Sequence, residues 1–396
     1  MSRRTADDTQ QGSANLDQHI SRRSILVRGV VQGVGFRPFV YRLAREANLA
    51  GSIGNNTAGV TIEIEGPPAQ LDIFLRRLCA QAPPLSRIDS IAVETLPASG
   101  VSGFHILSSQ VLGRVNTGIP ADAATCSDCL RELLDPADRR YRYPFLNCTN
   151  CGPRFTITRH IPYDRPQTSM AVFPMCAACQ AEYNDPMNRR FHAQPNACPL
   201  CGPHIWLEDN KGFAIPSGDP TVDAIARLVA GEVLAIKGIG GFHLSVDATN
   251  EPAVALLRQR KRRHGKPLAV MVRDLGSARA LCHLTAEEDA LLQSPARPIV
   301  LARARPGPIA PSIAPGVPWL GIFLPYAPLQ HLLFENPPGR PGLQALVMTS
   351  ANLSEEPIAI DNHEARIRLG GIADAFLMHN REILQRCDDS VAALVD

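Results

Sequence analysis

CSDC at residues 126–129 and CTNC at 148–151 are followed, fifty residues later, by CAAC at 176–179 and CPLC at 198–201. Each CxxC pair places two thiolates about one turn apart, and two pairs complete a tetrahedral shell of soft ligands. The spacing predicts two structural zinc ions. Their ligands are Cys126, Cys129, Cys148, Cys151, Cys176, Cys179, Cys198 and Cys201. Which CxxC pairs share an ion stays open.

The fifty-residue repeat extends beyond the cysteines. Asp135-Pro136 recurs as Asp185-Pro186, Arg139-Arg140-Tyr141 as Arg189-Arg190-Phe191, and Cys151-Gly152-Pro153 as Cys201-Gly202-Pro203. The sequence therefore predicts two copies of one small module in tandem.

The alternative to metal binding is a set of disulfides, which need an oxidising compartment. The first 18 residues are polar and hold no apolar core, so we expect no signal peptide. No apolar run approaches the length of a membrane span, so we expect no membrane partner. We therefore expect a cytoplasmic protein. In that reducing compartment, clustered CxxC pairs are metal ligands more often than disulfides.

Charge limits the kind of partner that the chain can bind. The 396 residues are 45% apolar and carry a formal net charge of +2. Two zinc ions on eight thiolates add four positive and eight negative charges, which gives about −2. This balance argues against wholesale nucleic-acid binding. One local exception is RQRKRRHGK at 258–266, which is either a solvated helix face or a binding surface.

The first part of the chain alternates strand and helix patterns. Residues 1–22 are polar with scattered charge and predict a disordered tail. Periodicity then predicts strands at 24–31, 51–55, 59–65, 91–94 and 104–107 and helices at 38–47 and 68–79. This βαββαβ order predicts a ferredoxin-like α+β sandwich over residues 23–110, with two helices on one face of an antiparallel sheet.

The remaining chain divides into two further regions, which makes the predicted fold class multi-domain α+β. Residues 122–207 have little periodicity and many prolines, so we expect this zinc region to need metal in order to fold. Residues 215–396 alternate helices with apolar strands and predict a mixed α/β domain. The sequence stops at Asp396, directly after the strand-like DDSVAALV, and we expect it to be part of a longer protein.

Residues 28–39, RGVVQGVGFRPF, predict a phosphate site. A strand enters a glycine-rich loop, and Arg37 stands where the next helix begins. Together with GSIGN at 51–55, this stretch resembles the acylphosphatase signature. The resemblance implies that Arg37 holds an acyl phosphate and that Asn55 orients the attacking water. It also implies phosphate binding by the loop residues Gln32, Gly33, Val34, Gly35 and Phe36. The alternative for Asn55 is a structural role in a turn.

Three segments of the last region could bind a nucleotide: KGIGGFHL at 237–244, RKRRHGKPLAV at 260–270 and VMTSANLS at 347–354. With Arg386 and DDSV at 388–391, they resemble the YrdC-like domain, which forms carbamoyl-type adenylates from ATP. The resemblance implies a set of residues that bind the nucleotide and its carboxylate-like co-substrate. They are Lys261, Arg263, Lys266, Ser350, Asn352 and Arg386.

An acylphosphatase-like module, two zinc modules and a YrdC-like domain, in this order, resemble the HypF family of hydrogenase-maturation carbamoyltransferases. The resemblance implies hydrolysis of carbamoyl phosphate and formation of carbamoyl adenylate from ATP with Mg²⁺. The carbamoyl group then passes to the C-terminal cysteine of a partner, HypE, as the precursor of the cyanide ligand in [NiFe]-hydrogenase. A further C-terminal domain performs this transfer in that family, so we expect hydrolysis and adenylation from this chain and doubt the transfer.

Two alternatives stay open. A YrdC-type tRNA-modifying enzyme, which makes threonylcarbamoyl adenylate, would bind RNA in a salt-dependent manner, including double-stranded RNA through the YrdC-like domain. A non-catalytic docking fragment would fold around zinc and leave carbamoyl phosphate unchanged. We prefer the maturation enzyme, because neither alternative explains the acylphosphatase signature.

Overall fold

The computed structural model describes residues 20–110, 118–263, 265–335, 339, 342–352 and 356–395. Residues 1–19 of the predicted tail therefore lie outside the described residues. The first domain is an antiparallel sheet in the order β4-β1-β3-β2, to which β5 adds in parallel beside β2. Its elements are β1 (Ser21–Val30), α1 (Phe36–Glu46), β2 (Ala50–Asn56), β3 (Gly59–Gly66), α2 (Pro68–Ala80), β4 (Arg87–Leu96) and β5 (Phe104–Ile106).

The predicted βαββαβ order is confirmed, and one apolar face of the sheet explains it. Ile25 and Val27 on β1, with Ile62 and Ile64 on β3, are fully buried at every second position. They form one core with the buried side chains of both helices, which therefore cover the same face. The prediction of a tail to residue 22 is wrong at its end, because β1 begins at Ser21 and pairs with both β3 and β4.

The zinc region contains little regular structure. It holds α3 (Ser127–Leu134), the 3-10 turn η1 (Arg165–Gln167) and α4 (Ala177–Asn184). Each α-helix begins directly after the first cysteine of its module. The small core of this region includes Cys129, Cys148 and Cys151 themselves, packed with Tyr143 and Phe145. The thiols therefore stand where a larger domain would place apolar side chains, which agrees with a fold that depends on metal.

The last domain is built on an eleven-stranded mixed sheet in the order β11-β12-β13-β10-β14-β9-β8-β15-β6-β7, with β16 beside β12. Its strands are β6 (Ile205–Asp209), β7 (Ala214–Ile215), β8 (Leu234–Lys237), β9 (Phe242–Asp247), β10 (Val270–Val272), β11 (Cys282–His283), β12 (Ile299–Ala304), β13 (Trp319–Phe323), β14 (Ala345–Ser350), β15 (Ala375–His379) and β16 (Val391–Ala392). Its helices are α5 (Pro220–Val229), α6 (Glu251–Lys261), α7 (Leu275–Leu281), α8 (Ala286–Gln293), η2 (Pro311–Ile313), α9 (Pro328–Leu333) and α10 (Asn362–Leu369).

This sheet is buried on both faces. Along β14, Ala345 and Val347 belong to one core cluster, and Leu346 and Met348 belong to another. Such burial explains why the predicted strands are continuous apolar runs. Leu207, the predicted end of the zinc region, lies in β6, and β6 pairs with β15 in the large sheet. The last domain therefore begins before residue 215.

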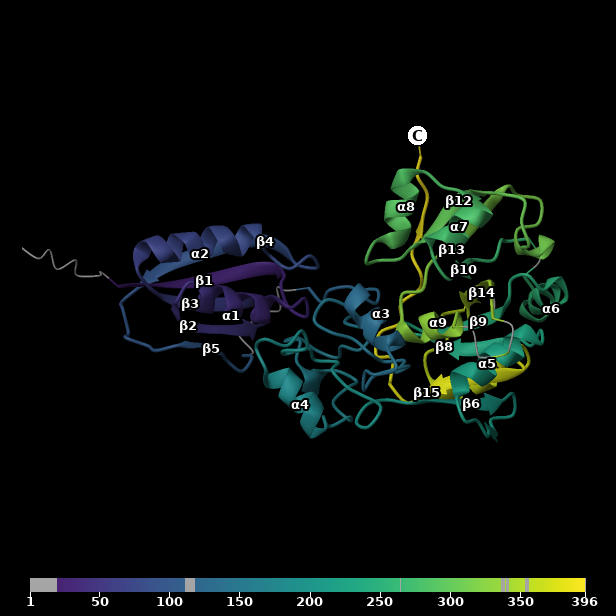
Figure 1. Ribbon diagram of the computed structural model, residues 1–396, viewed down its shortest axis with the longest axis horizontal. Coiled ribbons are helices and arrows are strands. Elements are labelled where there is room, and N and C mark those ends of the chain that lie inside the picture. The colour runs from purple at the N-terminus through teal and green to yellow at the C-terminus, as the bar shows by residue number, and fades with distance from the viewer. Residues whose placement is uncertain are drawn as a thin grey trace, which may run out of the picture.

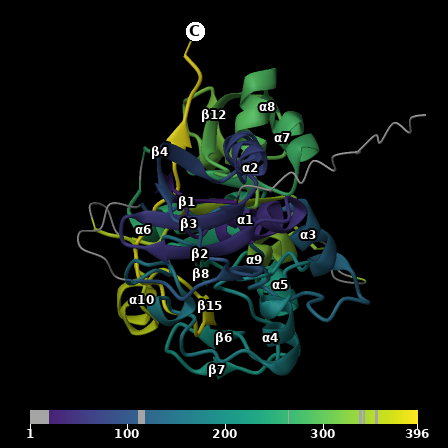
Figure 2. The ribbon, with the colours of Figure 1, turned by 90° about the vertical axis from the view of Figure 1, so that its left-hand side faces the viewer.

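The zinc region lies between the two larger domains (Figure 1), and the view along the long axis shows the first domain in front of the others (Figure 2). Backbone hydrogen bonds join the zinc region to the last domain. Ala124 N donates to Pro295 O at 2.8 Å, and Thr125 N donates to Tyr326 O at 3.0 Å. Among the described residues, we find no helix that is both long and apolar enough to cross a membrane.

Candidate functional site

The eight cysteines of the repeat form two compact clusters. One cluster holds Cys126, Cys129, Cys148 and Cys151, and the other holds Cys176, Cys179, Cys198 and Cys201. Within each cluster all Sγ atoms lie within 4.8 Å of one another. Each module therefore supplies one complete ligand set, and pairing of CxxC motifs between modules does not occur.

The Sγ separations fit a metal better than a disulfide. Neighbouring sulfurs lie 3.4–3.8 Å apart in the first cluster and 3.6–3.7 Å apart in the second. A disulfide needs about 2.05 Å. Four thiolates around a tetrahedral zinc, with Zn–S bonds of about 2.3 Å, stand about 3.8 Å apart. Both clusters thus have the donor set and the size of a closed structural zinc site.

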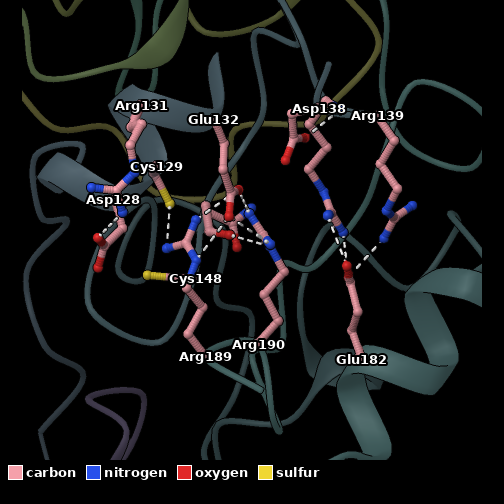
Figure 3. A network of polar contacts seen from close by, with 12 residues as sticks. Asp128, Cys129, Arg131, Glu132, Asp138, Arg139, Cys148, Glu182, Arg189 and Arg190 are labelled. Carbon is pink, nitrogen blue, oxygen red and sulfur yellow. Dashed lines mark hydrogen bonds and ion pairs between the residues drawn. The ribbon is translucent and has the colours of Figure 1, made fainter. Parts of the chain in front are cut away.

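Each module supplies arginines to the cluster of the other module (Figure 3). Arg189 of the second module donates to Cys129 Sγ at 3.2 Å and forms an ion pair with Glu132 at 2.7 Å. Arg139 of the first module donates to Cys179 Sγ at 3.5 Å and pairs with Glu182 at 2.7 Å.

The arginines that follow Arg189 and Arg139 in the repeat strengthen both contacts between the modules. Arg190 and Arg140 are buried and bind the same carboxylates, Glu132 and Glu182. Although burial opposes ionisation, hydrogen bonds from Arg140 and Arg139 lower the pKa of Glu182 to about 2. The repeated Arg-Arg pair and the glutamates at the same offset can be found in the sequence. The sequence did not indicate that the arginines of each module bind the glutamate of the other module.

The loop between β1 and α1 forms a cradle for an anion. Gly33 and Gly35 have φ of 71° and 76°, a conformation that glycine adopts without strain and that turns backbone N–H groups inward. Gly35 also caps α1, so the helix amino terminus faces the same space. The side chains of Val34 and Phe36 are buried in the core. Only the backbone of these two predicted phosphate ligands is therefore left for a phosphate.

Arg37 and Asn55, the two residues that the acylphosphatase resemblance singles out, contact each other. Both side chains are buried, and Asn55 Oδ1, with the amide turned to match its donors, accepts from Arg37 Nε and Nη2 at 3.2 Å. The sequence did not indicate a third partner. Asp164 Oδ1, from the zinc region, accepts from Arg37 Nη2 at 3.0 Å.

The zinc region also holds the loop in place. Gln32, predicted as a phosphate ligand, uses its side chain inside the protein: Nε2 donates to Asn56 O at 2.7 Å, and Oε1 accepts from Tyr163 N at 3.1 Å. Arg154 donates from Nε to Gly33 O and lines the same cavity as Arg37. The one sequence signal for Arg154 is a break in the repeat, because His204 stands at the matching position of the second module.

A second cavity lies in the last domain and contains part of the predicted nucleotide site. Arg263, Ser350, Asp388 and Asp389 line a cleft of about 740 Å³. Lys266 and Arg386 do not line it. Arg386 Nε instead donates to Ile358 O at 2.6 Å. Residues 353 and 354 of the predicted segment 347–354 lie outside the described residues.

Lys261, which was predicted to contact a triphosphate, donates to the protein in this structure. Its Nζ donates to Ser350 O at 2.7 Å, to Asn352 Oδ1 at 3.0 Å and to Asn352 O. An ammonium group has three protons, and all three are used. Burial, followed by the charge of Arg263, lowers the pKa of Lys261 to about 8. Lys261 therefore positions Ser350 and Asn352.

Three family models match successive parts of the chain. The model described as Acylphosphatase matches residues 23–106, and the one described as HypF finger matches residues 125–158 and 175–208. The one described as Telomere recombination, for the Sua5, YciO and YrdC proteins, matches residues 226–396. These matches cover the cradle, both cysteine clusters and the second cavity.

Individual proteins match over the same regions. Carbamoyltransferase HypF2 of Cupriavidus necator is 56% identical over 383 residues, which cover 93% of this chain and 48% of that protein. The crystal structure of a full-length HypF in its phosphate- and nucleotide-bound form superposes with a TM-score of 0.90 at 48% identity, over 95% of this chain and 48% of the other. The acylphosphatase of Thermus thermophilus is 40% identical over 82 residues, or 92% of its length. The chain thus spans about half the length of the carbamoyltransferases that it matches.

Proposed function

The chain belongs to the HypF family of carbamoyltransferases, and we propose that it hydrolyses carbamoyl phosphate in the Arg37 cradle and uses ATP to activate the carbamate in the second cavity. The observation that carries the proposal is the cradle. It joins two left-handed glycines, a helix amino terminus and a buried arginine beside Asn55. The two steps together convert an activated but unstable acyl phosphate into a carbamoyl adenylate.

The first step needs little from the protein except positioning and charge. Water attacks the acyl phosphate, which releases carbamate and inorganic phosphate, and Arg37 with the loop N–H groups stabilises the charge that builds on the phosphoryl oxygens. Asn55 lies within hydrogen-bond distance of Arg37 and is suited to orient the water. Asp164 holds the guanidinium in the absence of phosphate. It must share or yield that contact when a substrate binds.

The second step joins two substrates in the cleft of the last domain. A carbamate oxygen attacks the α-phosphorus of ATP, which forms carbamoyl adenylate and releases pyrophosphate. Arg263 carries the positive charge of the cleft and suits the triphosphate, and the carboxylates of Asp388 and Asp389 suit Mg²⁺. Ser350 offers a hydroxyl in the same cleft.

The two cysteine clusters serve as scaffolds in this proposal. Four thiolates saturate a tetrahedral zinc and leave no open position for chemistry. Transfer of the carbamoyl group to the C-terminal cysteine of HypE, in the maturation of [NiFe]-hydrogenase, is the fate that the family implies for the adenylate. A tRNA-modifying function has weaker support, because it leaves the acylphosphatase and HypF finger matches without a role.

The test follows both products from one purified, zinc-loaded chain. We expect phosphate release from carbamoyl phosphate without ATP, and AMP and pyrophosphate from ATP only when carbamoyl phosphate is present. A trapping nucleophile such as hydroxylamine would capture the adenylate and make AMP measurable without the partner. A folded chain that releases no phosphate would overturn the proposal.

Replacement of Arg263 by alanine should separate the two activities. We expect the KM for ATP to rise about 10–100-fold, because one charge-assisted contact to the triphosphate is lost. Phosphate release should stay within twofold of the wild type, since Arg263 lines the second cavity and is not among the residues that line the cradle. The matched control is Arg262→Ala, an exposed neighbour. Equal effects of the two substitutions would remove Arg263 from the nucleotide site.

A further inference from the structure

One wall of the cradle comes from the zinc region and not from the first domain. Arg154, Tyr163 and His192 line the same cavity as Gly33 and Arg37. The acylphosphatase of Thermus thermophilus aligns with 82 residues over 92% of its own length, so it has no counterpart of the zinc region. The cradle of this chain therefore contains side chains that lie outside the acylphosphatase signature. The first reaction step, as described above, uses none of these three.

His192 is held at the cradle by its neighbours in the second module. Its ring packs on Tyr183 and Phe191, with ring centres 4.9 and 4.6 Å apart. The repeat places Arg142 at the same offset in the first module, with the same φ of 54°. Arg142, however, forms an ion pair with Asp219 beside the last domain. The module thus sets the backbone at this position, whereas the side chain differs with the neighbour that it faces.

Two polar atoms of this wall are buried without a partner. Within the part of the chain that the structure describes, neither Tyr163 Oη nor His192 Nδ1 takes part in a hydrogen bond. The Tyr163 ring lies against the loop, since its Cδ1 and Cε1 are 3.2 Å from the position that a Cβ atom would take at Gly33. Buried polar groups normally find partners, because an unmade hydrogen bond is costly. In a ligand cavity, such atoms point to contacts that the ligand completes.

Both groups are neutral near pH 7. Burial, followed by the charge of Arg37, lowers the pKa of His192 to about 4. Burial raises the pKa of Tyr163 to about 12. Tyr163 therefore has a proton to donate, and a neutral imidazole that is protonated on Nε2 leaves Nδ1 as an acceptor. The wall thus offers one donor and one acceptor, whereas Arg37 and the loop N–H groups supply the donors for a phosphate.

We propose that this wall binds the acyl group of the substrate and selects a carbamoyl group. His192 Nδ1 accepts from the amino group, and Tyr163 Oη donates to the carbonyl oxygen. As water attacks phosphorus, the bond between phosphorus and the acyl oxygen breaks and its electron pair leaves with the carbamate, whose charge the Tyr163 hydroxyl stabilises. An acetyl group has the same carbonyl but a methyl group in place of the amino group, which leaves His192 Nδ1 unmatched. This inference rests on the proposed function and names the residues that select its substrate.

Substrate preference tests the role of His192. Phosphate release from carbamoyl phosphate and from acetyl phosphate is measured for the zinc-loaded chain and for His192→Phe, which keeps a ring against Tyr183 and Phe191. We expect kcat/KM for carbamoyl phosphate to fall at least about tenfold and kcat/KM for acetyl phosphate to stay within about twofold, because only the amino group loses its partner. An equal loss for both substrates, or no loss for either, would overturn the role of His192.

Tyr163→Phe removes only the hydroxyl group. Because both substrates carry the carbonyl oxygen, we expect kcat/KM to fall about tenfold for each, with their ratio unchanged. The matched control is Tyr143→Phe, which removes the hydroxyl of another buried tyrosine of the zinc region, one that donates to Pro203 O and does not line the cradle. It should leave both rates within about twofold. Wild-type kinetics in a Tyr163→Phe chain would remove Tyr163 from the acyl site.

Binding of stable analogues separates this inference from the proposed hydrolysis. Phosphonoacetamide carries the carbamoyl group on a methylene bridge, and acetonylphosphonate carries the acetyl group on the same bridge. In calorimetric titration, the wild-type chain should bind phosphonoacetamide at least about tenfold more tightly, and His192→Phe should lose this preference. Such a preference without turnover of carbamoyl phosphate would keep the acyl site and remove the proposed function. Turnover without the preference would keep the proposed function and remove the acyl site.

Discussion

Replacement of Arg37 by alanine is expected to lower kcat/KM for phosphate release from carbamoyl phosphate by about 10²–10³-fold. The guanidinium is the one cationic side chain of the first domain that lines the cradle, and removal of one preorganised donor to developing charge costs this much in comparable sites. Lysine at this position should restore little, because it lacks the planar fork that holds two phosphate oxygens. The measurement is initial phosphate release under saturating and subsaturating carbamoyl phosphate.

Two controls make the Arg37 result interpretable. Arg42→Ala changes an exposed arginine of the same helix α1 and should leave kcat and KM unchanged. Melting of each variant should show that the fold is intact, because Arg37→Ala also releases Asp164 and Asn55 from their shared partner. A correctly folded Arg37→Ala chain that hydrolyses carbamoyl phosphate at the wild-type rate would remove the cradle as the site of the first step.

Local patterns in the sequence were sufficient to predict the helices and strands and to indicate candidate residues that lie within one segment. The cysteine spacing predicted two four-cysteine sites but left the pairing of the CxxC motifs open, and the alternation of apolar residues in the sequence predicted β1 and β3. Arg37 and Asn55 were singled out by their resemblance to the acylphosphatase signature, and their roles stay predictions. Each of these predictions depends on residues that are close in sequence or share one well-known signature.

Contacts between distant segments were not predictable. Asp164 reaches Arg37 from a loop without periodicity, 127 residues away. Lys261 lies in a basic run that suggests phosphate binding, yet its buried ammonium group donates to Ser350 O and Asn352 Oδ1 in this structure. Tertiary packing decides whether a cationic side chain faces a ligand or the protein. The pattern of charges in the sequence does not predict which of the two it will face.

Replacement of Cys179 by serine is expected to weaken zinc binding at both clusters, although Cys179 belongs to one cluster only. The substitution removes a ligand from the second module and the sulfur that accepts from Arg139 and Arg140. As the second module loosens, Arg189 leaves Cys129 and the carboxylate of Glu132. Partners of this kind contribute about 10–100-fold to metal affinity. We therefore expect the first site to lose zinc to a chelator at least about tenfold faster than in the wild type.

Zinc content by mass spectrometry and release kinetics with a chromogenic chelator measure this coupling directly. Cys79→Ser changes an exposed cysteine outside the clusters and should keep two zinc ions per chain. Arg189→Met leaves every ligand in place and should speed release from the first site alone. A Cys179→Ser chain that keeps one zinc ion with wild-type release kinetics would show that the modules are independent.

If the modules are coupled, the cradle is coupled to them too, because Arg154 follows Cys151 by three residues and donates to Gly33 O. Loss of either ion should then weaken carbamoyl phosphate hydrolysis in a domain that contains no zinc ligand.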